Sequence, residues 1–263
     1  IIKEPFYEYL PVKKTTSRYT PGDDRAIRKI PEWFEYEGDG YLSRHSTLES
    51  NGDSLVDSYA RIYELSGSRM QVLPARHSLS IVGSDKNLLI KQDTVSYIAC
   101  QSPVISGRWY VPATVTSHDG GGRVQSTKEI LIRDDYGNPI EIVTNHSEHV
   151  IYLWGYYGQR LVAQIKGATY VEVENALGTS PVSLSQLFSP VSTISGLQAR
   201  LPGAQVYTYT YHPYAGVDSE TAPNGQTTCY DYDAKGRLVK SYRTGENGKQ
   251  EILQLNNYHI INE

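Results

Sequence analysis

The amino-acid sequence predicts a mainly β protein, in which consecutive antiparallel hairpins form a curved or spiralling sheet with a small helical insert. The composition of the 263 residues favours strands and turns, because 22 are tyrosine, 22 are glycine and 13 are proline, whereas one is methionine. Hairpin signals recur along the chain, most clearly between Pro223 and Tyr242. One hairpin cannot bury its own face, so recurrent hairpins indicate a repeat architecture.

The clearest hairpin is centred on a predicted turn at residues 233–236. Before this turn, Thr228, Tyr230 and Tyr232 recur at the two-residue period of a strand. The aspartate that opens the turn can accept hydrogen bonds from the following amides, and the closing glycine tolerates positive φ because it has no Cβ. The partner strand is expected at residues 237–243.

This hairpin resembles a known repeat. The pattern Tyr-x-Tyr-Asp-x-x-Gly-Arg-Leu, which begins at Tyr230, is similar to the YD-repeat unit of the rearrangement-hotspot (Rhs) and teneurin families. Two degenerate copies precede it, and the whole arrangement resembles the C-terminal portion of YD-repeat proteins of the Bacteroidetes type. The residues that carry the resemblance, all in structural roles, are Tyr230, Tyr232, Asp233, Gly236, Arg237, Leu238, Asp134, Gly137, Asn138, Trp154 and Gly158.

The resemblance implies a function as well as a fold. In these families the strands spiral into a hollow shell or a barrel, which encloses a toxin or presents an adhesive surface. The self-cleaving members carry an aspartate-rich segment with a glycine-rich core, which has no counterpart here. The resemblance therefore implies a non-catalytic structural segment, a shell or scaffold, of a secreted or cell-surface bacterial repeat protein.

Further strands are expected between turns rich in glycine and aspartate. Residues 54–65 carry apolar groups on both faces, which predicts a strand covered on both sides. Pro11, Pro74, Pro112 and Pro139 each precede a small or branched apolar residue, which predicts strands that begin at a kink. The expected strands are residues 7–14, 32–37, 54–65, 70–82, 88–100, 109–117, 125–133 and 206–211, with turns at 21–24, 38–40, 83–85 and 119–122.

A helical insert is predicted from cap signals. Thr169 and Glu172 form a capping-box pattern, and Gly178 follows the last apolar position of that helix. Ser183 and Ser189 are expected to cap two further short helices. Ile194, Leu197 and Leu201 are expected to form the stripe of the last helix. Four segments follow: a β-rich region of degenerate repeats (1–127), YD-like units (128–166), the helical insert (167–203) and C-terminal hairpins (204–263).

Composition bears on several classes of function. The net charge is -4 without a basic cluster, which argues against nucleic-acid binding. No apolar run approaches the roughly 18 residues that a membrane-spanning helix needs. Cys100 and Cys229 are too few for a disulfide framework, so either two free thiols or one bridge is expected. The chain opens at Ile1 without methionine, which suggests a piece of a longer repeat polypeptide.

No catalytic, metal or cofactor site is predicted. His146 and His149 are three residues apart in an expected loop, whereas the zinc helix motif needs histidines four apart. Asp119 beside three glycines has no following helix to bind a phosphate. Asp134 with Asp135, and Asp231 with Asp233, could be pairs of catalytic carboxylates, but the turn-start positions of Asp134 and Asp233 explain them. Ser195 lies within an expected helix and lacks a nucleophile elbow.

The aromatic residues leave two interpretations. Three tryptophans and 22 tyrosines could pack across hairpins, or a part of them could form a surface that binds glycans or proteins. Contiguous exposed rings would favour binding, whereas buried rings would favour a scaffold. Apolar residues near the start, Ile1, Ile2, Phe6, Tyr7 and Tyr9, predict a bare N-terminal strand edge through which copies self-associate.

Overall fold

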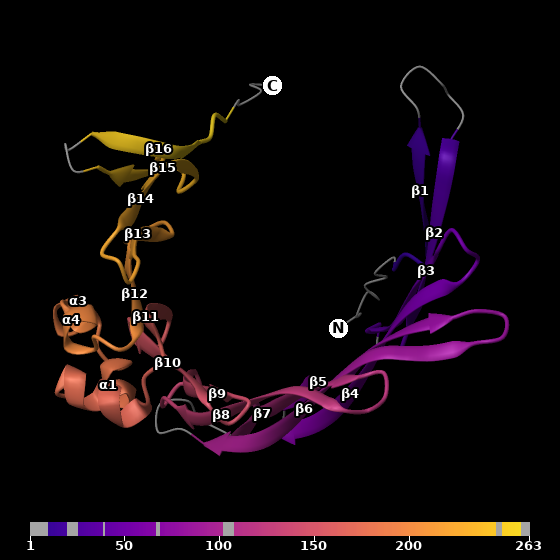
Figure 1. Ribbon diagram of the computed structural model, residues 1–263, viewed down its shortest axis with the longest axis horizontal. Helices are drawn as coiled ribbons and strands as arrows, with labels where there is room; N and C mark the ends of the chain where they lie inside the picture. The colour runs from indigo at the N-terminus through magenta and orange to yellow at the C-terminus, as the bar shows by residue number, and fades with distance from the viewer. Residues whose placement is uncertain are drawn as a thin grey trace, which may run out of the picture. The chain divides into compact units, whose positions relative to one another are not determined.

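The computed structural model describes residues 10–19, 26–38, 40–66, 69–101, 108–245 and 249–258. The chain forms two compact units: Ile1–Cys100 with Gly107–Lys128, and Gln101–Ser106 with Glu129–Glu263. In each unit, neighbouring strands follow the order of the sequence (Figure 1). Every strand pair whose register is known is antiparallel. The mainly β fold of consecutive antiparallel hairpins with a small helical insert is thereby confirmed.

The strands of the first unit match most of the predicted segments. An unpredicted strand, β3, has polar residues at alternating positions and no continuous apolar pattern. The predicted strand at residues 7–14 is replaced by β1, which begins at Lys13; residues 1–9 and the predicted turn at 21–24 lie outside the described residues. The strands are β1 (Lys13–Tyr19), β2 (Ala26–Tyr36), β3 (Leu42–Leu48), β4 (Ser54–Ser66), β5 (Arg69–Val82), β6 (Asn87–Gln101) and β7 (Arg108–Asp119).

The second unit adds the hairpins of the repeat and the helices. The boundary between the units falls within β8 (Val124–Arg133). The remaining elements are β9 (Pro139–Thr144), β10 (Glu148–Gly155), β11 (Arg160–Lys166), α1 (Tyr170–Leu177), α2 (Pro181–Leu184), α3 (Val191–Ile194), α4 (Leu197–Arg200), β12 (Gln205–Tyr211), β13 (Val217–Thr221), β14 (Thr227–Tyr232), β15 (Leu238–Thr244) and β16 (Gln250–Leu255).

A hydrophobic core lies in the second unit, where the helices are packed beside β10–β12 (Figure 1). Leu184, Leu197 and Ile151 are almost completely buried. Each such side chain contributes about 1.5–3 kcal/mol relative to an exposed position. The core consists of Ile140, Ile151, Leu153, Val162, Ala163, Ile165, Ala168, Val173, Leu177, Leu184, Ile194, Leu197, Leu201, Ala204 and Val206.

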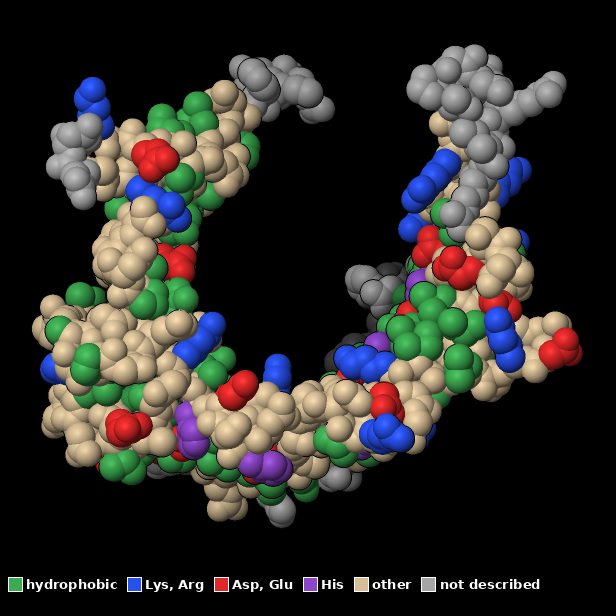
Figure 2. Space-filling model, viewed as in Figure 1, with side chains coloured by type: hydrophobic (Ala, Val, Ile, Leu, Met, Phe, Trp, Pro, Cys, Tyr) green, Lys and Arg blue, Asp and Glu red, His purple; other side chains and the backbone are tan. Residues whose placement is uncertain are grey.

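The first unit has few buried apolar side chains. Among its described residues, the buried hydrophobic ones are Val56, Leu73 and Val111. The prediction that the strand at 54–65 is covered on both sides is wrong, because the neighbouring residues Ile62 and Tyr63 are 40% and 43% exposed. Hydrophobic side chains stand among charged ones on the surface seen in Figure 2. Apolar burial therefore specifies strand register only weakly in this unit.

The helical insert begins as predicted and then departs from the prediction. The capping box of Thr169 with Glu172 is formed, and Gly178 ends α1 with a φ of +72°. The cap of α2 is Ser180 rather than Ser183, because the Ser180 hydroxyl accepts a hydrogen bond from the backbone N of Val182.

The third helix begins later than predicted and is shorter. Its N-cap is Pro190 rather than Ser189, and Ser195 stands at its C-cap instead of inside a helix. Gly196, with a φ of +69°, then separates α3 from α4. The predicted stripe of Ile194, Leu197 and Leu201 is buried, but two short helices supply it.

Candidate functional site

The C-terminal repeat turn is a closed network of hydrogen bonds. Asp233 Oδ1 accepts from the backbone N of Lys235 at 2.9 Å and of Arg237 at 3.0 Å, and Oδ2 pairs with the Arg237 guanidinium at 2.7 Å. The hydrogen bonds from the backbone and the side chain of Arg237 lower the pKa of Asp233. Gly236 has a φ of +73°, and its N donates to the Asp233 carbonyl at 2.9 Å. Asp231 lies outside this network and pairs with Lys240 at 2.9 Å.

The turn at Asp134 repeats this geometry. Asp134 Oδ1 accepts from the backbone N of Tyr136 and Asn138, and Oδ2 accepts from the Asn138 amide at 3.0 Å. Gly137 has a φ of +87° and donates to the Asp134 carbonyl. The Asn138 amide also donates to the Gly158 carbonyl at 2.8 Å, so the structure brings together these residues of two predicted repeat copies.

A recurring hydrogen bond joins aromatic side chains to the backbone of the preceding strand. Tyr232 Oη donates to the Val217 carbonyl at 2.8 Å, and Trp154 Nε1 donates to the Pro139 carbonyl at 2.8 Å. We call this bond an aromatic tie. The ties run from Tyr36 to Pro11, Tyr97 to Pro74, Trp154 to Pro139, Tyr211 to Leu161, Tyr232 to Val217 and Tyr258 to Leu238.

The ties obey one positional rule: the donor is one residue beyond the residue that lies opposite the acceptor. In β13 and β14, for example, the pairing of Ser219 with Cys229, extended along both strands, places Asp231 opposite Val217. The donor Tyr232 is the residue after Asp231. Each tie therefore closes the open end of a strand pair, where the sheet ladder stops. Tyrosine hydroxyls are protonated donors at neutral pH, and burial raises the pKa of Tyr232 and of Tyr211 further.

Three of the predicted kink prolines accept such ties. The carbonyls of Pro11, Pro74 and Pro139 each accept from an aromatic side chain. Proline has no N–H to donate to a ladder, which suits a position where regular pairing ends. The proline repeat of the sequence therefore marks three of the six acceptors of these ties.

A polar ladder crosses the first unit on seven successive strands. It consists of Lys14, Glu32, His45, Asp57, His77, Asp93 and Ser117, one from each of β1–β7. In its first half, Lys14 Nζ lies 3.3 Å from Glu32 Oε1, and His45 Nε2 lies 3.2 Å from Glu32 Oε2. The hydrogen bonds from His45 and Lys14 lower the pKa of Glu32. His45 Nδ1 then lies 3.7 Å from Asp57 Oδ2.

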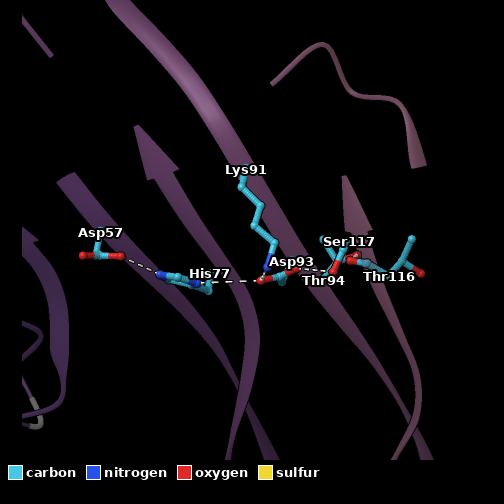
Figure 3. Close-up of polar contacts among 7 residues, drawn as sticks. All are labelled: Asp57, His77, Lys91, Asp93, Thr94, Thr116 and Ser117. Atoms are coloured by element: carbon cyan, nitrogen blue, oxygen red, sulfur yellow. Dashed lines mark hydrogen bonds and ion pairs between the residues drawn. The ribbon is translucent and has the colours of Figure 1, made fainter. Parts of the chain in front are cut away.

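Figure 3 shows the second half of the polar ladder. His77 Nε2 is 2.8 Å from Asp57 Oδ1, and its Nδ1 is 3.9 Å from Asp93 Oδ2 (Figure 3). Asp93 also accepts a hydrogen bond from Ser117 and pairs with Lys91 at 2.9 Å. Burial raises the pKa of Asp93, but the hydrogen bonds from Ser117 and Lys91 outweigh it, and the net shift is downward.

The polar ladder supplies the register information that apolar burial lacks. Each histidine stacks on an aromatic ring, His45 on Phe34 and His77 on Tyr59, with centroids 4.8 and 4.9 Å apart. A shift of one residue in any strand would turn its ladder member to the opposite face. The sequence prediction missed this feature, because its members are dispersed between residues 14 and 117.

The remaining candidate residues from the sequence do not come together in one site. Asp119 binds its own turn through the backbone N of Gly121 and Arg123. His146 lies 3.1 Å from Glu129, whereas His149 pairs with Glu141 on β9, which the sequence prediction did not consider. In the part of the chain that the structure describes, no three His, Cys, Asp or Glu side chains are placed to hold a metal ion.

The structure also bears on the expectations for the two cysteines and for membrane-spanning helices. Cys100 and Cys229 are free thiols, so of the two predicted alternatives the bridge is not formed. No helix in the described ranges is long and apolar enough to cross a membrane.

Comparisons with known proteins give remote structural similarities. No protein-family model and no curated protein matches the chain. A crystal structure of TcdB2-TccC3 without its hypervariable C-terminal region is 12% identical over 92% of this chain, with a TM-score of 0.36, and the chain spans 12% of its length. A Tc holotoxin pore of Photorhabdus luminescens has 8% identity over 93% of this chain, 20% of its own length and a TM-score of 0.21.

A third similar structure is that of a porin-like protein. This protein, from Bacteroides uniformis, has 11% identity over 92% of this chain and 93% of its own length, with a TM-score of 0.23.

Proposed function

We propose that this chain is a structural segment of a longer bacterial YD-repeat protein, secreted or displayed at the cell surface, and that it builds a shell or scaffold rather than carrying out catalysis. The observation that carries the proposal is the series of aromatic ties. The same bond recurs in both units and uses the aromatic side chains to fasten one strand to the next. The resemblance of the Tyr230–Leu238 pattern to the YD repeat supports the same proposal.

The aspartates of the repeat support a structural role too. Asp134 and Asp233 each accept backbone hydrogen bonds within their own turn. A carboxylate whose oxygens are occupied in this way is poorly placed to act as a general acid or base. The polar ladder likewise joins strand to strand.

The experiment compares two tyrosines of the second unit. Tyr232→Phe removes the hydroxyl of an aromatic tie, and Tyr214→Phe removes a hydroxyl from a side chain that is 91% exposed. The scaffold proposal predicts that Tyr232→Phe lowers the free energy of unfolding by about 1 kcal/mol, the usual value of one hydrogen bond. Tyr214→Phe should leave it unchanged. Equal urea midpoints for the two variants would contradict the proposal.

One observation favours a second candidate function, a surface that binds glycans or proteins. Tyr157 and Phe188 are 52% and 67% exposed, and their ring centroids are 6.1 Å apart. Tyr156 and Tyr157 both have positive φ, which costs about 1–2 kcal/mol for each residue that is not glycine. Loss of glycan binding in a Tyr157→Ala and Phe188→Ala double variant that remains folded would support this candidate.

A further inference from the structure

The second unit carries a contiguous group of aromatic rings at the turn that joins β10 to β11. Tyr156 and Tyr157 stand in this turn, and Phe188 lies between α2 and α3. The centroid of the Phe188 ring lies 6.0 Å from that of Tyr156 and 6.1 Å from that of Tyr157. The Tyr156 ring lies in turn 5.8 Å from the ring of Tyr211, at the end of β12. We call these four residues the aromatic patch.

The outer side of the aromatic patch is apolar and is held in place by the backbone. Tyr157 and Phe188 are 52% and 67% exposed, and Leu187 beside them is 43% exposed. The backbone N of Tyr157 donates to the Leu187 carbonyl at 3.3 Å. That of Gly158 donates to the Ser185 carbonyl at 2.8 Å. An exposed apolar surface that is fixed before binding marks an interaction site and loses little conformational entropy when a partner docks.

A guanidinium group starts from the same face of the hairpin as Phe188. Gly155 and Arg160 lie directly opposite each other in β10 and β11, so both point to one face of the strand pair. A Cβ added at Gly155 would lie 2.5 Å from Cγ of Pro190, the second residue after Phe188. The segment that carries Phe188 therefore covers the face from which the Arg160 side chain emerges.

Arg160 is half-buried, and its guanidinium lies over tyrosine rings. Its Cζ lies 4.7 Å from the ring centre of Tyr211 and 6.0 Å from that of Tyr156. Among the residues that the structure describes, no carboxylate pairs with this guanidinium and no oxygen accepts a hydrogen bond from it. The carboxylate of Asp135, at the margin of the patch, accepts from the Gln186 amide instead. A planar guanidinium binds a carboxylate through two parallel hydrogen bonds, so Arg160 is suited to a carboxylate of a partner.

The orientation of the rings indicates which apolar groups fit beside this carboxylate. The Tyr156 ring is inclined by 69° to the ring of Phe188 and by 78° to that of Tyr211. The Tyr157 and Phe188 rings are inclined by 48°. Rings inclined in this way present edges and recesses rather than one flat face on which a sugar ring could stack. Aliphatic and aromatic side chains of a polypeptide fit such recesses, and Leu187 adds an aliphatic contact.

We propose that the aromatic patch and Arg160 bind a protein partner through a segment in which an aspartate or glutamate adjoins large apolar side chains. The carboxylate of the partner pairs with the Arg160 guanidinium. Its apolar side chains contact Tyr157, Leu187 and Phe188. Tyrosine and arginine are among the residue types that contribute most of the binding energy at protein interfaces. The proposal rests on the second candidate function, whose partner it specifies, and it goes beyond the scaffold function.

Peptide display on the full chain provides the test. A phage library of random dodecapeptides is selected on the wild type, and the enriched peptides are synthesised with a fluorescent label for anisotropy measurements. The enriched peptides should combine an acidic residue with aromatic or aliphatic ones. Replacement of that acidic residue by its amide should weaken binding about tenfold, because a hydrogen bond between charged groups is lost. Binding should also weaken as the salt concentration rises from about 0.05 to 0.5 M.

Variants show whether the peptides bind at this surface. Phe188→Ala and Arg160→Gln should each weaken the binding of an enriched peptide about tenfold. Tyr214→Ala and Lys166→Gln are the matched controls and should bind like the wild type. Tyr214 is an aromatic side chain that is 91% exposed, and Lys166 is an exposed cation with its Nζ 5.4 Å from the centre of the Tyr207 ring. Circular dichroism establishes that every variant is folded.

Three results would overturn the proposal. The first is that no peptide is enriched, or that the enriched peptides lack acidic residues. The second is equal binding by the patch variants and their controls. The third is that the chain binds no peptide but binds neutral or uronic-acid oligosaccharides through Phe188, which would leave the second candidate function standing with a glycan as its ligand. If Arg160→Gln fails to fold, the amide substitution in the peptide decides the role of the carboxylate. None of these results affects the scaffold proposal, which the tyrosine variants test.

Discussion

Gly158→Ala tests how tightly two copies of the repeat are fastened together. Gly158 has a φ of +73°, and a Cβ at this position would lie 2.3 Å from Cδ2 and 2.6 Å from Cγ of Tyr136. Its backbone N donates to the Ser185 carbonyl at 2.8 Å, and its carbonyl accepts from Asn138 at 2.8 Å. The glycine is thus held on both sides, and the backbone cannot relax without the loss of a hydrogen bond.

The cost of the substitution has two parts. Positive φ penalises alanine by about 1 kcal/mol relative to glycine. The overlap with the Tyr136 ring adds about 1–3 kcal/mol, the usual cost of overpacking. The free energy of unfolding should therefore fall by about 2–4 kcal/mol in Gly158→Ala.

Gly236→Ala is the matched control. Gly236 has the same φ of +73°, but the nearest atom to its added Cβ is the Tyr214 carbonyl oxygen at 3.5 Å, an ordinary contact. This variant should lose only the conformational part, about 1 kcal/mol. Urea unfolding followed by circular dichroism and by tyrosine fluorescence measures both. Equal losses in the two variants would refute the reasoning, because the contact with Tyr136 would then contribute nothing.

Three further predictions concern the turn, the polar ladder and the chain as a whole. Gly236→Val should lower the free energy of unfolding by roughly 1–3 kcal/mol, since a β-branched residue is strained at positive φ, and an unchanged urea midpoint would remove the turn assignment. In the folded protein, the pKa of Glu32 lies below its ordinary 4.5 and that of Asp93 below its ordinary 3.8. The two ionised carboxylates therefore stabilise the folded state at pH values above the ordinary pKa values, and this stabilisation is lost as the pH falls through the lowered pKa values. The free energy of unfolding, measured as the pH is lowered, should show this loss, and its slope against pH should be shallower in Glu32→Gln than in the wild type. An equal slope in the two proteins would count against the polar ladder. The chain should self-associate through its N-terminal strands, whose first residues lie outside the described ranges; light scattering that finds a monomer at high concentration would reject this.

Local patterns predicted the repeat turns and the first helix correctly. The aspartate and glycine of the turn at residues 233–236 act within four residues, and so does the capping box of Thr169 and Glu172. Such interactions depend on short spacings that a sequence displays directly. The residues that form the turns could therefore be named in advance.

Long-range contacts could not be predicted in the same way. The pairing of His149 with Glu141 requires the register of β9 and β10, and the polar ladder requires the registers of seven strands. The last two helices were expected as one because their apolar spacing is continuous, yet Gly196 at positive φ separates them. In each case the deciding interaction lies outside the local window of the pattern.

Hydrogen–deuterium exchange of Tyr232→Phe tests most directly whether aromatic ties hold the strands together. The tie joins β14 to the start of β13, so its loss should accelerate amide exchange in peptides that cover residues 217–232. Peptides from β9 and β10, which carry their own tie through Trp154, should exchange at the wild-type rate. Unchanged exchange in β13 and β14 would contradict the account, as would an equal acceleration in every peptide.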